Sequence, residues 1–204
     1  KVFTAGEHDY DEAVGYFGMS RAYGIMSDAE IKDPGYADNI VVDGLIDVRS
    51  EYNFGNSQNC AKRDLGSADN ANPTNFTGEV VNAIIIGRQI LNNAQADATE
   101  TSPGSLSPDA AAALAVQIEI AALTWEKCIA ATVVHYINDV QGDMANFVGD
   151  EFADLDNFKD LAKHWSEGTG FALGLQFSPF SPFRDASVPG IDVDSLKTIL
   201  QLVG

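Results

Sequence analysis

Residues 107–147 read SPDAAAALAVQIEIAALTWEKCIAATVVHYINDVQGDMANF, with no glycine or proline between Pro108 and Gly142. Ser107 followed by proline and an early acid is typical of a helix start, because a hydroxyl caps the helix and proline fits its first position. Apolar residues then recur every three or four positions, which is the spacing of a helix face. Further apolar residues widen this face almost all the way round, so we expect a central, mostly buried helix about 50–60 Å long.

The rest of the chain predicts more helices and almost no strands. Further helices are expected over three segments with the same apolar spacing: 77–91, 154–165 and 192–202. Residues 9–18 resemble the end of a helix that begins upstream of the given sequence, with Gly18 as its stop signal. Residues 171–177 fit a helix or a strand by pattern alone, and we expect the preceding helix to continue through them.

Two stretches, 19–59 and 92–108, are rich in turn-forming residues and predict long irregular loops. Together these patterns predict an all-α protein, a helical bundle around one long central helix. At 204 residues the chain is long enough for a good core, and we expect residues 1–204 to form a single domain.

The chain is strongly acidic, with 30 acidic residues against 12 basic ones and a net charge of −18. Such a charge argues against binding nucleic acid or anionic lipid, and it suits solubility or the binding of divalent cations. In so acidic a chain we expect four charged residues to form structural ion pairs: Arg49, Arg63, Asp64 and Arg88. Nothing approaches 18 consecutive apolar residues, so no transmembrane helix is predicted.

Each of the three histidines precedes a carboxylate by one helical turn, and the pairs are His8 with Glu12, His135 with Asp139, and His164 with Glu167. Helical bundles build iron, manganese and zinc sites from such pairs. The alternative is that each acid only orients its histidine or lies at a helix end. Because two ligands seldom suffice, an iron or zinc site formed by His164 and Glu167 would need His8 or Glu12 as well.

A second group of candidates, His135, Asp139 and Glu126, lies on the long helix, where buried charges need partners. Glu126 stands nine residues before His135, roughly on the opposite face of that helix.

Asp43, Asp47 and Glu51 could form a calcium-binding loop. An EF-hand loop needs oxygen ligands at its third and twelfth positions, which are Val41 and Ser50 here. The loop therefore departs from the pattern, and we expect weak calcium binding or an ordinary acidic turn.

Five blocks of sequence stand in the order EAVGYFG (12–18), SEYNFG (50–55), AKRD (61–64), WEK with HYIN (125–127 and 135–138), and HWSE with GFALGLQFSP (164–167 and 170–179). Together they resemble an imelysin-like bacterial family whose members are described as a domain of unknown function. The blocks span nearly the whole chain, which makes the resemblance more specific than any one of them.

The resemblance implies a helical bundle located in the periplasm or on the cell surface, often as a lipoprotein, with a link to iron uptake. Family members are longer, so this chain would be the C-terminal part of such a protein. The absent N-terminal part or an outer-membrane protein would then be its partner. Imelysins carry a Gly-x-His-x-x-Glu motif and were once assigned as metallopeptidases. Here His164 and Glu167 match the motif, but Ala162 replaces its glycine, which weakens the transfer of peptidase activity.

We therefore expect a non-enzymatic, extracytoplasmic domain that binds a metal ion, with iron or zinc as the candidates, or a metal-bearing ligand. A metallopeptidase using His164 and Glu167 is the alternative, and a structural or partner-binding module is a third interpretation. Cys60 and Cys128 are the two cysteines of the chain. In a secreted protein they would be expected to form a disulfide, and otherwise Cys128 would be a small buried residue near His135.

Overall fold

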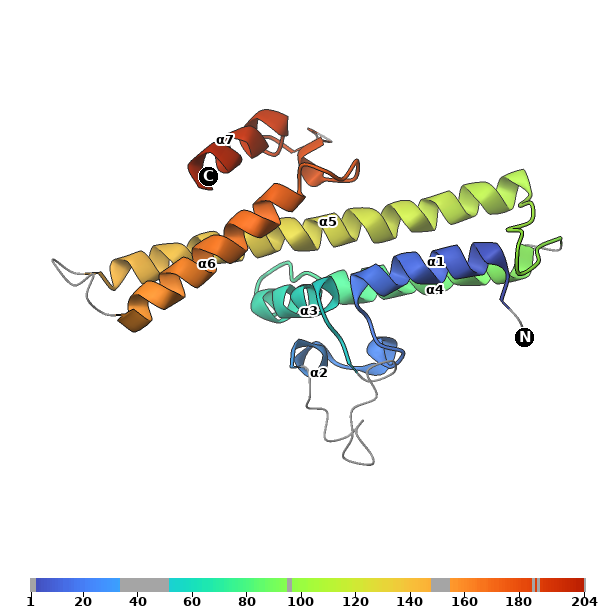
Figure 1. Cartoon of the computed structure of the whole chain (residues 1–204), viewed down its shortest axis with the longest axis horizontal. Coiled ribbons are helices and arrows are strands. Elements are labelled where there is room, and N and C mark those ends of the chain that lie inside the picture. The colour runs from blue at the N-terminus through green and yellow to red at the C-terminus, as the bar shows by residue number, and fades with distance from the viewer. Residues whose placement is uncertain are drawn as a thin grey trace, which may run out of the picture. The chain divides into compact units, whose positions relative to one another are not determined.

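The computed structural model describes residues 3–33, 52–94, 97–147, 155–184, 186 and 188–203. Within these ranges the protein is all-α and contains no strand, as the sequence predicts (Figure 1). Its α-helices are α1 (Ala5–Phe17), α2 (Asp28–Lys32), α3 (Asn56–Ser67), α4 (Phe76–Ala94), α5 (Pro108–Ala145), α6 (Leu155–Gly174) and α7 (Val193–Val203). Two short 3₁₀ helices, η1 and η2, cover Tyr23–Ile25 and Pro182–Arg184. None of the described helices is both long enough and apolar enough to cross a membrane.

The chain forms two compact units, Lys1–Trp125 and Glu126–Gly204, here called unit 1 and unit 2. Helix α5 contributes its first half to unit 1 and its second half to unit 2. Helix α5 belongs to both units, so this division does not decide between one domain and two. The single domain of residues 1–204 therefore stays a prediction.

Helix α5 has 38 residues and begins where its sequence predicts. The Oγ of Ser107 accepts a hydrogen bond from the backbone N–H of Ala110, at 3.2 Å, and so caps the helix. The expectation of burial almost all round was wrong. Leu114 and Val133 are less than a tenth exposed, whereas Val116 and Val134 are 51% and 57% exposed. A row of apolar residues on this helix therefore faces outward instead of a core.

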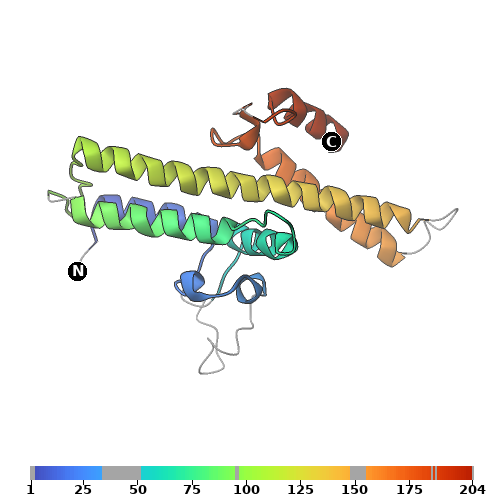
Figure 2. The ribbon, with the colours of Figure 1, turned by 180° about the vertical axis from the view of Figure 1, so that it is seen from behind.

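In unit 1, α1 lies alongside α4, as both views show (Figures 1 and 2). The prediction that α1 begins upstream was wrong, because Thr4 forms a capping box with Glu7 and starts the helix at Ala5. Gly18 ends the helix in the left-handed conformation, with φ of 89°, and a side chain at this position would collide with the backbone oxygen of Phe54.

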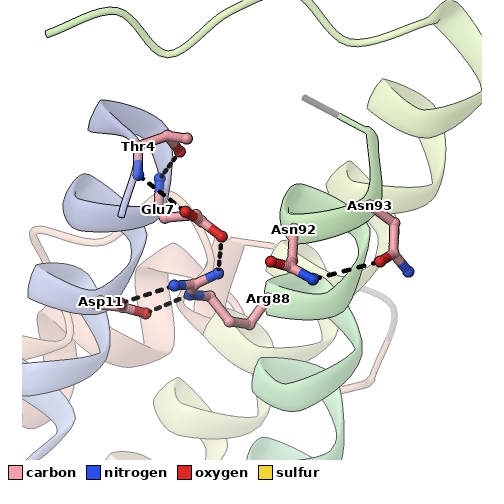
Figure 3. Close-up of polar contacts among 6 residues, drawn as sticks. All are labelled: Thr4, Glu7, Asp11, Arg88, Asn92 and Asn93. Carbon is pink, nitrogen blue, oxygen red and sulfur yellow. Dashed lines mark hydrogen bonds and ion pairs between the residues drawn. The ribbon is translucent and has the colours of Figure 1, made fainter. Parts of the chain in front are cut away.

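A buried carboxylate fastens α1 to α4 (Figure 3). Glu7 is 2% exposed and accepts hydrogen bonds from Arg88 Nη1, at 2.6 Å, and from the backbone N–H of Thr4, at 2.9 Å. The same guanidinium donates from Nε to Asp11 at 2.8 Å. The predicted structural ion pairing of Arg88 is thereby confirmed, whereas Arg49 lies outside the described residues.

The segment 19–59, expected to be irregular, holds η1, α2 and the start of α3. Buried hydrogen bonds, and not a long apolar stripe, connect its described residues. The side-chain oxygen of Asn53 accepts a hydrogen bond from the backbone N–H of Ser20 at 2.8 Å, and the hydroxyl of Tyr23 donates one to the carbonyl of Ser57 at 3.0 Å. Asp64 on α3 accepts hydrogen bonds from the first two backbone N–H groups of α4, those of Phe76 and Thr77, and the helix begins one residue before the predicted range 77–91.

Unit 2 has a small core between α5, α6 and α7. Its fully buried centre is Val133, Ala172, Leu175 and Leu196, and partly buried apolar residues surround it. Residues 171–174 continue α6, which confirms helix over strand for them, but the helix ends at Gly174 and residues 175–177 form a turn, so the predicted continuation to residue 177 was too long.

Candidate functional site

A groove in unit 2 is the best candidate for a ligand site. It has a volume of about 240 Å³ and is formed by the second half of α5 together with α6 and α7. Its lining is apolar except for a few polar side chains, a composition typical of small-molecule sites. The lining residues are Val133, Tyr136, Ile137, Val140, Gln141, His164, Trp165, Gly168, Thr169, Ile199, Leu202 and Val203.

The floor of this groove depends on the close approach of α6 to α5. A Cβ atom added to Gly168 would lie 3.1 Å from the Cβ of Tyr136, closer than ordinary packing allows. A larger residue at this position would therefore push the two helices apart. Ala172, one turn further along α6, is fully buried in the core of unit 2. Gly170 and Gly174, in contrast, have no neighbour within 4 Å of an added Cβ, so close packing is required at Gly168 but not at those two glycines.

His164 is the one histidine that lines the groove, and its partner comes from another helix. Its Nδ1 lies 2.7 Å from Oδ2 of Asp143 near the end of α5, and the two side chains are 22% and 17% exposed. When Asp143 is ionised its oxygens only accept, so Nδ1 of His164 carries the proton. In the neutral imidazole Nε2 then keeps its lone pair and can accept a hydrogen bond or bind a metal. We refer to this pair as the His164–Asp143 dyad.

One aromatic ring, that of Tyr136, lies near His164 of the dyad. The ring of Tyr136 lies 6.0 Å from that of His164 and stacks on Phe171 at 5.8 Å, with an interplanar angle of 16°. Trp165, which also lines the groove, is 45% exposed. The imidazole thus has a carboxylate at Nδ1 and one aromatic neighbour, Tyr136, and it lines a groove that is mostly apolar.

The four predicted metal ligands fall in different units. His8 and Glu12 lie on α1 in unit 1, exposed, with Nε2 and Oε1 3.4 Å apart. His164 and Glu167 lie on α6 in unit 2, but Glu167 is not one of the residues that line the groove. In the part of the chain that the structure describes, no three His, Cys, Asp or Glu residues lie close enough together to hold a metal ion. The four-residue metal site therefore stays a prediction.

The second group of candidates is divided as well. His135 pairs with Asp139 one turn further along α5, at 3.1 Å, as the spacing predicts. Glu126 instead interacts with the hydroxyl of Ser178 in the segment after α6. Burial raises the pKa of Glu126, and the hydrogen bond with Ser178 partly offsets this rise.

Asp43, Asp47 and Glu51, the candidate calcium ligands, lie outside the described residues. Cys60 and Cys128 are both buried thiols, one in each unit, so the structure gives no support to a disulfide between them.

Comparison with protein-family models found no match, and neither the curated proteins nor the solved structures contain a significant match to this chain. The resemblance to imelysin-like proteins therefore rests on the sequence blocks alone, and what it implies for location and iron uptake stays a prediction.

Asp143 is the site residue that sequence reasoning missed. The sequence pairs His164 with Glu167, three residues onward, because neighbours on one helix can be identified by spacing alone. Asp143 stands 21 residues earlier, on a helix that α6 folds back along (Figure 1). A signal was available, since the two helices are joined by a short connection and should pair in antiparallel fashion. Which side chains then face each other depends on the rotation of each helix about its own axis. The spacing of apolar residues does not specify that rotation.

Proposed function

We propose that this protein is a binding domain that holds a metal-bearing ligand in the unit 2 groove, with Nε2 of His164 as a ligand to the metal. The observation that carries the proposal is the 2.7 Å contact between Nδ1 of His164 and Asp143 at the edge of an apolar groove. Metal-binding histidines generally donate their other ring N–H to a carboxylate, which fixes the tautomer and makes the coordinating nitrogen more basic.

Binding is better supported than peptidase chemistry. A catalytic zinc needs three protein ligands, an open position for water and a nearby general base. His164 is the one residue of the groove lining with a strong metal-coordinating side chain, and Glu167 is not part of that lining. The resemblance to imelysin-like proteins would place such binding outside the cytoplasm, in the acquisition of iron.

The proposal competes with a purely structural role, in which the dyad only fastens α5 to α6. The discriminating experiment measures iron and zinc by mass spectrometry in protein purified without added metal and again after loading. Loading uses ferric citrate, zinc chloride and iron protoporphyrin in parallel, each followed by desalting. The variants are His164→Ala and, as a matched control, His135→Ala, which also removes a histidine paired with a carboxylate but lies outside the groove lining.

We expect the wild type and His135→Ala to retain metal from at least one source and His164→Ala to lose it. Equal retention in His164→Ala, or no retention by the wild type from any source, would refute the proposal. A lower melting temperature of His164→Ala with unchanged metal content would establish the structural role instead.

A further inference from the structure

We infer that unit 1 carries a docking groove for a cationic amphipathic helix of another protein. This groove, here called the unit 1 groove, lies between α1, α4 and the first half of α5 and has a volume of about 200 Å³. Three properties carry the inference: the apolar lining, the length of the groove along two helices, and the acidic charge of its walls. The inference is independent of the function proposed for unit 2.

The first property is the apolar lining. The lining residues are Tyr10, Ala13, Val14, Phe17, Val80, Ile84, Ile118, Ala121, Ala122 and Trp125. Three of them, Ala13, Ala121 and Ala122, are small and leave room for the side chain of a partner, and Ile118 is 43% exposed. The Tyr10 hydroxyl already donates to a backbone carbonyl of α4, at 3.1 Å. Because burying apolar surface drives association, such a lining favours a partner with large apolar side chains.

The second property is the length of the unit 1 groove. Its lining runs from Tyr10 to Phe17 on α1 and from Ile118 to Trp125 on α5. Both views show α1, α4 and this half of α5 side by side (Figures 1 and 2). Seven residues of helix span about 10 Å, or two turns. A helix that docks in a groove presents its apolar side chains at i, i+3, i+4 and i+7, which cover the same length.

The third property is the charge of the two helices that form the walls. Helix α1 and residues 108–125 of α5 contain acidic residues and no lysine or arginine. Asp9 stands four residues before Ala13 on α1, and Glu119 stands three residues before Ala122 on α5, so each acid neighbours a lining residue on its own helix. Both acids are exposed. Each wall therefore offers a carboxylate to a bound partner.

Helix α4 does not reverse this charge. Its one basic residue, Arg88, is bound to Glu7 and Asp11 on α1, at 2.6 and 2.8 Å. A partner with lysine or arginine beside its apolar face would meet carboxylates on both walls. An acidic partner, including a second copy of this chain with its net charge of −18, would be repelled. Charge complementarity therefore selects a cationic helix among the apolar partners.

The test is a titration of the full chain with a synthetic helical peptide of about 18 residues, or five turns, with leucine on one face and lysine on the other. A peptide with glutamate in place of lysine is the second probe. Trp125 lines the unit 1 groove and the other tryptophan lies in unit 2, so in a Trp165→Phe background the fluorescence of Trp125 reports occupancy of the groove.

Two pairs of variants separate the shape of the groove from the charge around it. Ala122→Phe fills the groove, and its matched control, Ala113→Phe, places the same side chain at an exposed alanine of α5 outside the lining. Glu119→Lys reverses a charge on a wall. Its control, Asp69→Lys, makes the same change in net charge at an exposed position after α3.

We expect one lysine peptide to bind per chain with a change in Trp125 fluorescence, and the glutamate peptide to bind at least about tenfold more weakly. Ala122→Phe should weaken binding by about tenfold or more, because it occupies the space of the partner's central side chain, and Ala113→Phe should leave binding unchanged. Glu119→Lys should weaken binding by about two- to fivefold, more at low salt than at high salt, and Asp69→Lys by less.

Equal binding by the wild type and Ala122→Phe, equal binding of the two peptides, or no binding of the lysine peptide by the wild type would overturn the inference. If Ala122→Phe lost helical circular dichroism, Glu119→Lys and Asp69→Lys would decide, and equal weakening by these two would overturn it. Sedimentation of the chain alone as a dimer that Ala113→Phe keeps and Ala122→Phe loses would show a second copy in the groove, and would also overturn it.

Discussion

The pairing of Arg88 with the buried Glu7 should dominate the stability of unit 1. Arg88→Met keeps most of the side-chain volume but leaves the Glu7 carboxylate, 2% exposed, without its cationic partner. Removing one partner of a buried ion pair usually costs about 3–5 kcal/mol of unfolding free energy. Glu7 keeps its hydrogen bond from the backbone N–H of Thr4, so we expect a loss near the lower end, about 3 kcal/mol.

Two further variants separate the buried pair from the exposed one. Asp11 binds the same guanidinium, but its side chain is 54% exposed, and exposed ion pairs contribute less than about 1 kcal/mol. Asp11→Asn is therefore the matched control and should change little. The double variant Glu7→Gln with Arg88→Met removes the stranded charge, so it should be more stable than Arg88→Met alone by about 2 kcal/mol.

The assay can be confined to unit 1, because the two tryptophans of the chain lie in different units. Trp125 is in unit 1, with its ring 5.2 Å from that of Phe17 at the end of α1. In a Trp165→Phe background the fluorescence comes from Trp125 and reports the loss of its contact with Phe17 of α1 during urea unfolding. If Arg88→Met and Asp11→Asn shifted the transition equally, or if the double variant were no more stable than Arg88→Met, the reasoning about the buried charge would be wrong.

Three other outcomes are expected. Gly18→Ala should destabilise unit 1 by more than about 1 kcal/mol in the same urea assay, because φ is 89° and the new Cβ would collide with the Phe54 oxygen. Glu126→Gln should stabilise the protein at neutral pH. Burial raises the pKa of Glu126 above 4.5, so ionisation of this carboxyl at higher pH opposes folding. The gain in melting temperature over the wild type should therefore vanish when melting curves are measured below pH 4.5. Cys60 and Cys128 should both react with Ellman's reagent in denaturant without reductant and resist it in the native protein, and fewer than two reactive thiols would show a disulfide.

The helices that sequence predicts well are those with a continuous apolar stripe. Helix α5 begins at the predicted proline because Ser107 caps it, a signal that depends on neighbouring residues only. Helix α2 was missed although Ser27 and Glu30 form a capping box at its start, which is a local signal. Helix α3 is held by contacts distant in sequence, such as the hydroxyl of Tyr23 donating to the carbonyl of Ser57. No local pattern announces a pairing across 34 residues.

The burial of α5 was overestimated for a related reason. Apolar residues on nearly all sides of a helix predict a buried helix only if other elements cover every side. Here Val116 and Ile120 on one half of α5 and Val134 on the other are 40–57% exposed. The sequence of a helix shows which of its faces are apolar enough to be buried. Which of those faces are buried in the fold depends on how many helices lie next to it and where they lie.

In the candidate site, too, neighbours along one helix could be predicted from the sequence, whereas a contact between two helices could not. Sequence spacing pairs His164 with Glu167 on the same helix, whereas the structure places Asp143 of α5 against its Nδ1. The difference matters for function, because a carboxylate on the same helix would leave His164 independent of the packing of α5 and α6. With Asp143 as the partner, the orientation of Nε2 depends on that packing, and Gly168 sets how closely the two helices approach. A ligand that binds Nε2 should therefore also stabilise unit 2, because ligand binding to the folded state alone raises its stability. The contact that orients His164 therefore also joins α5 to α6, in addition to the apolar core of unit 2.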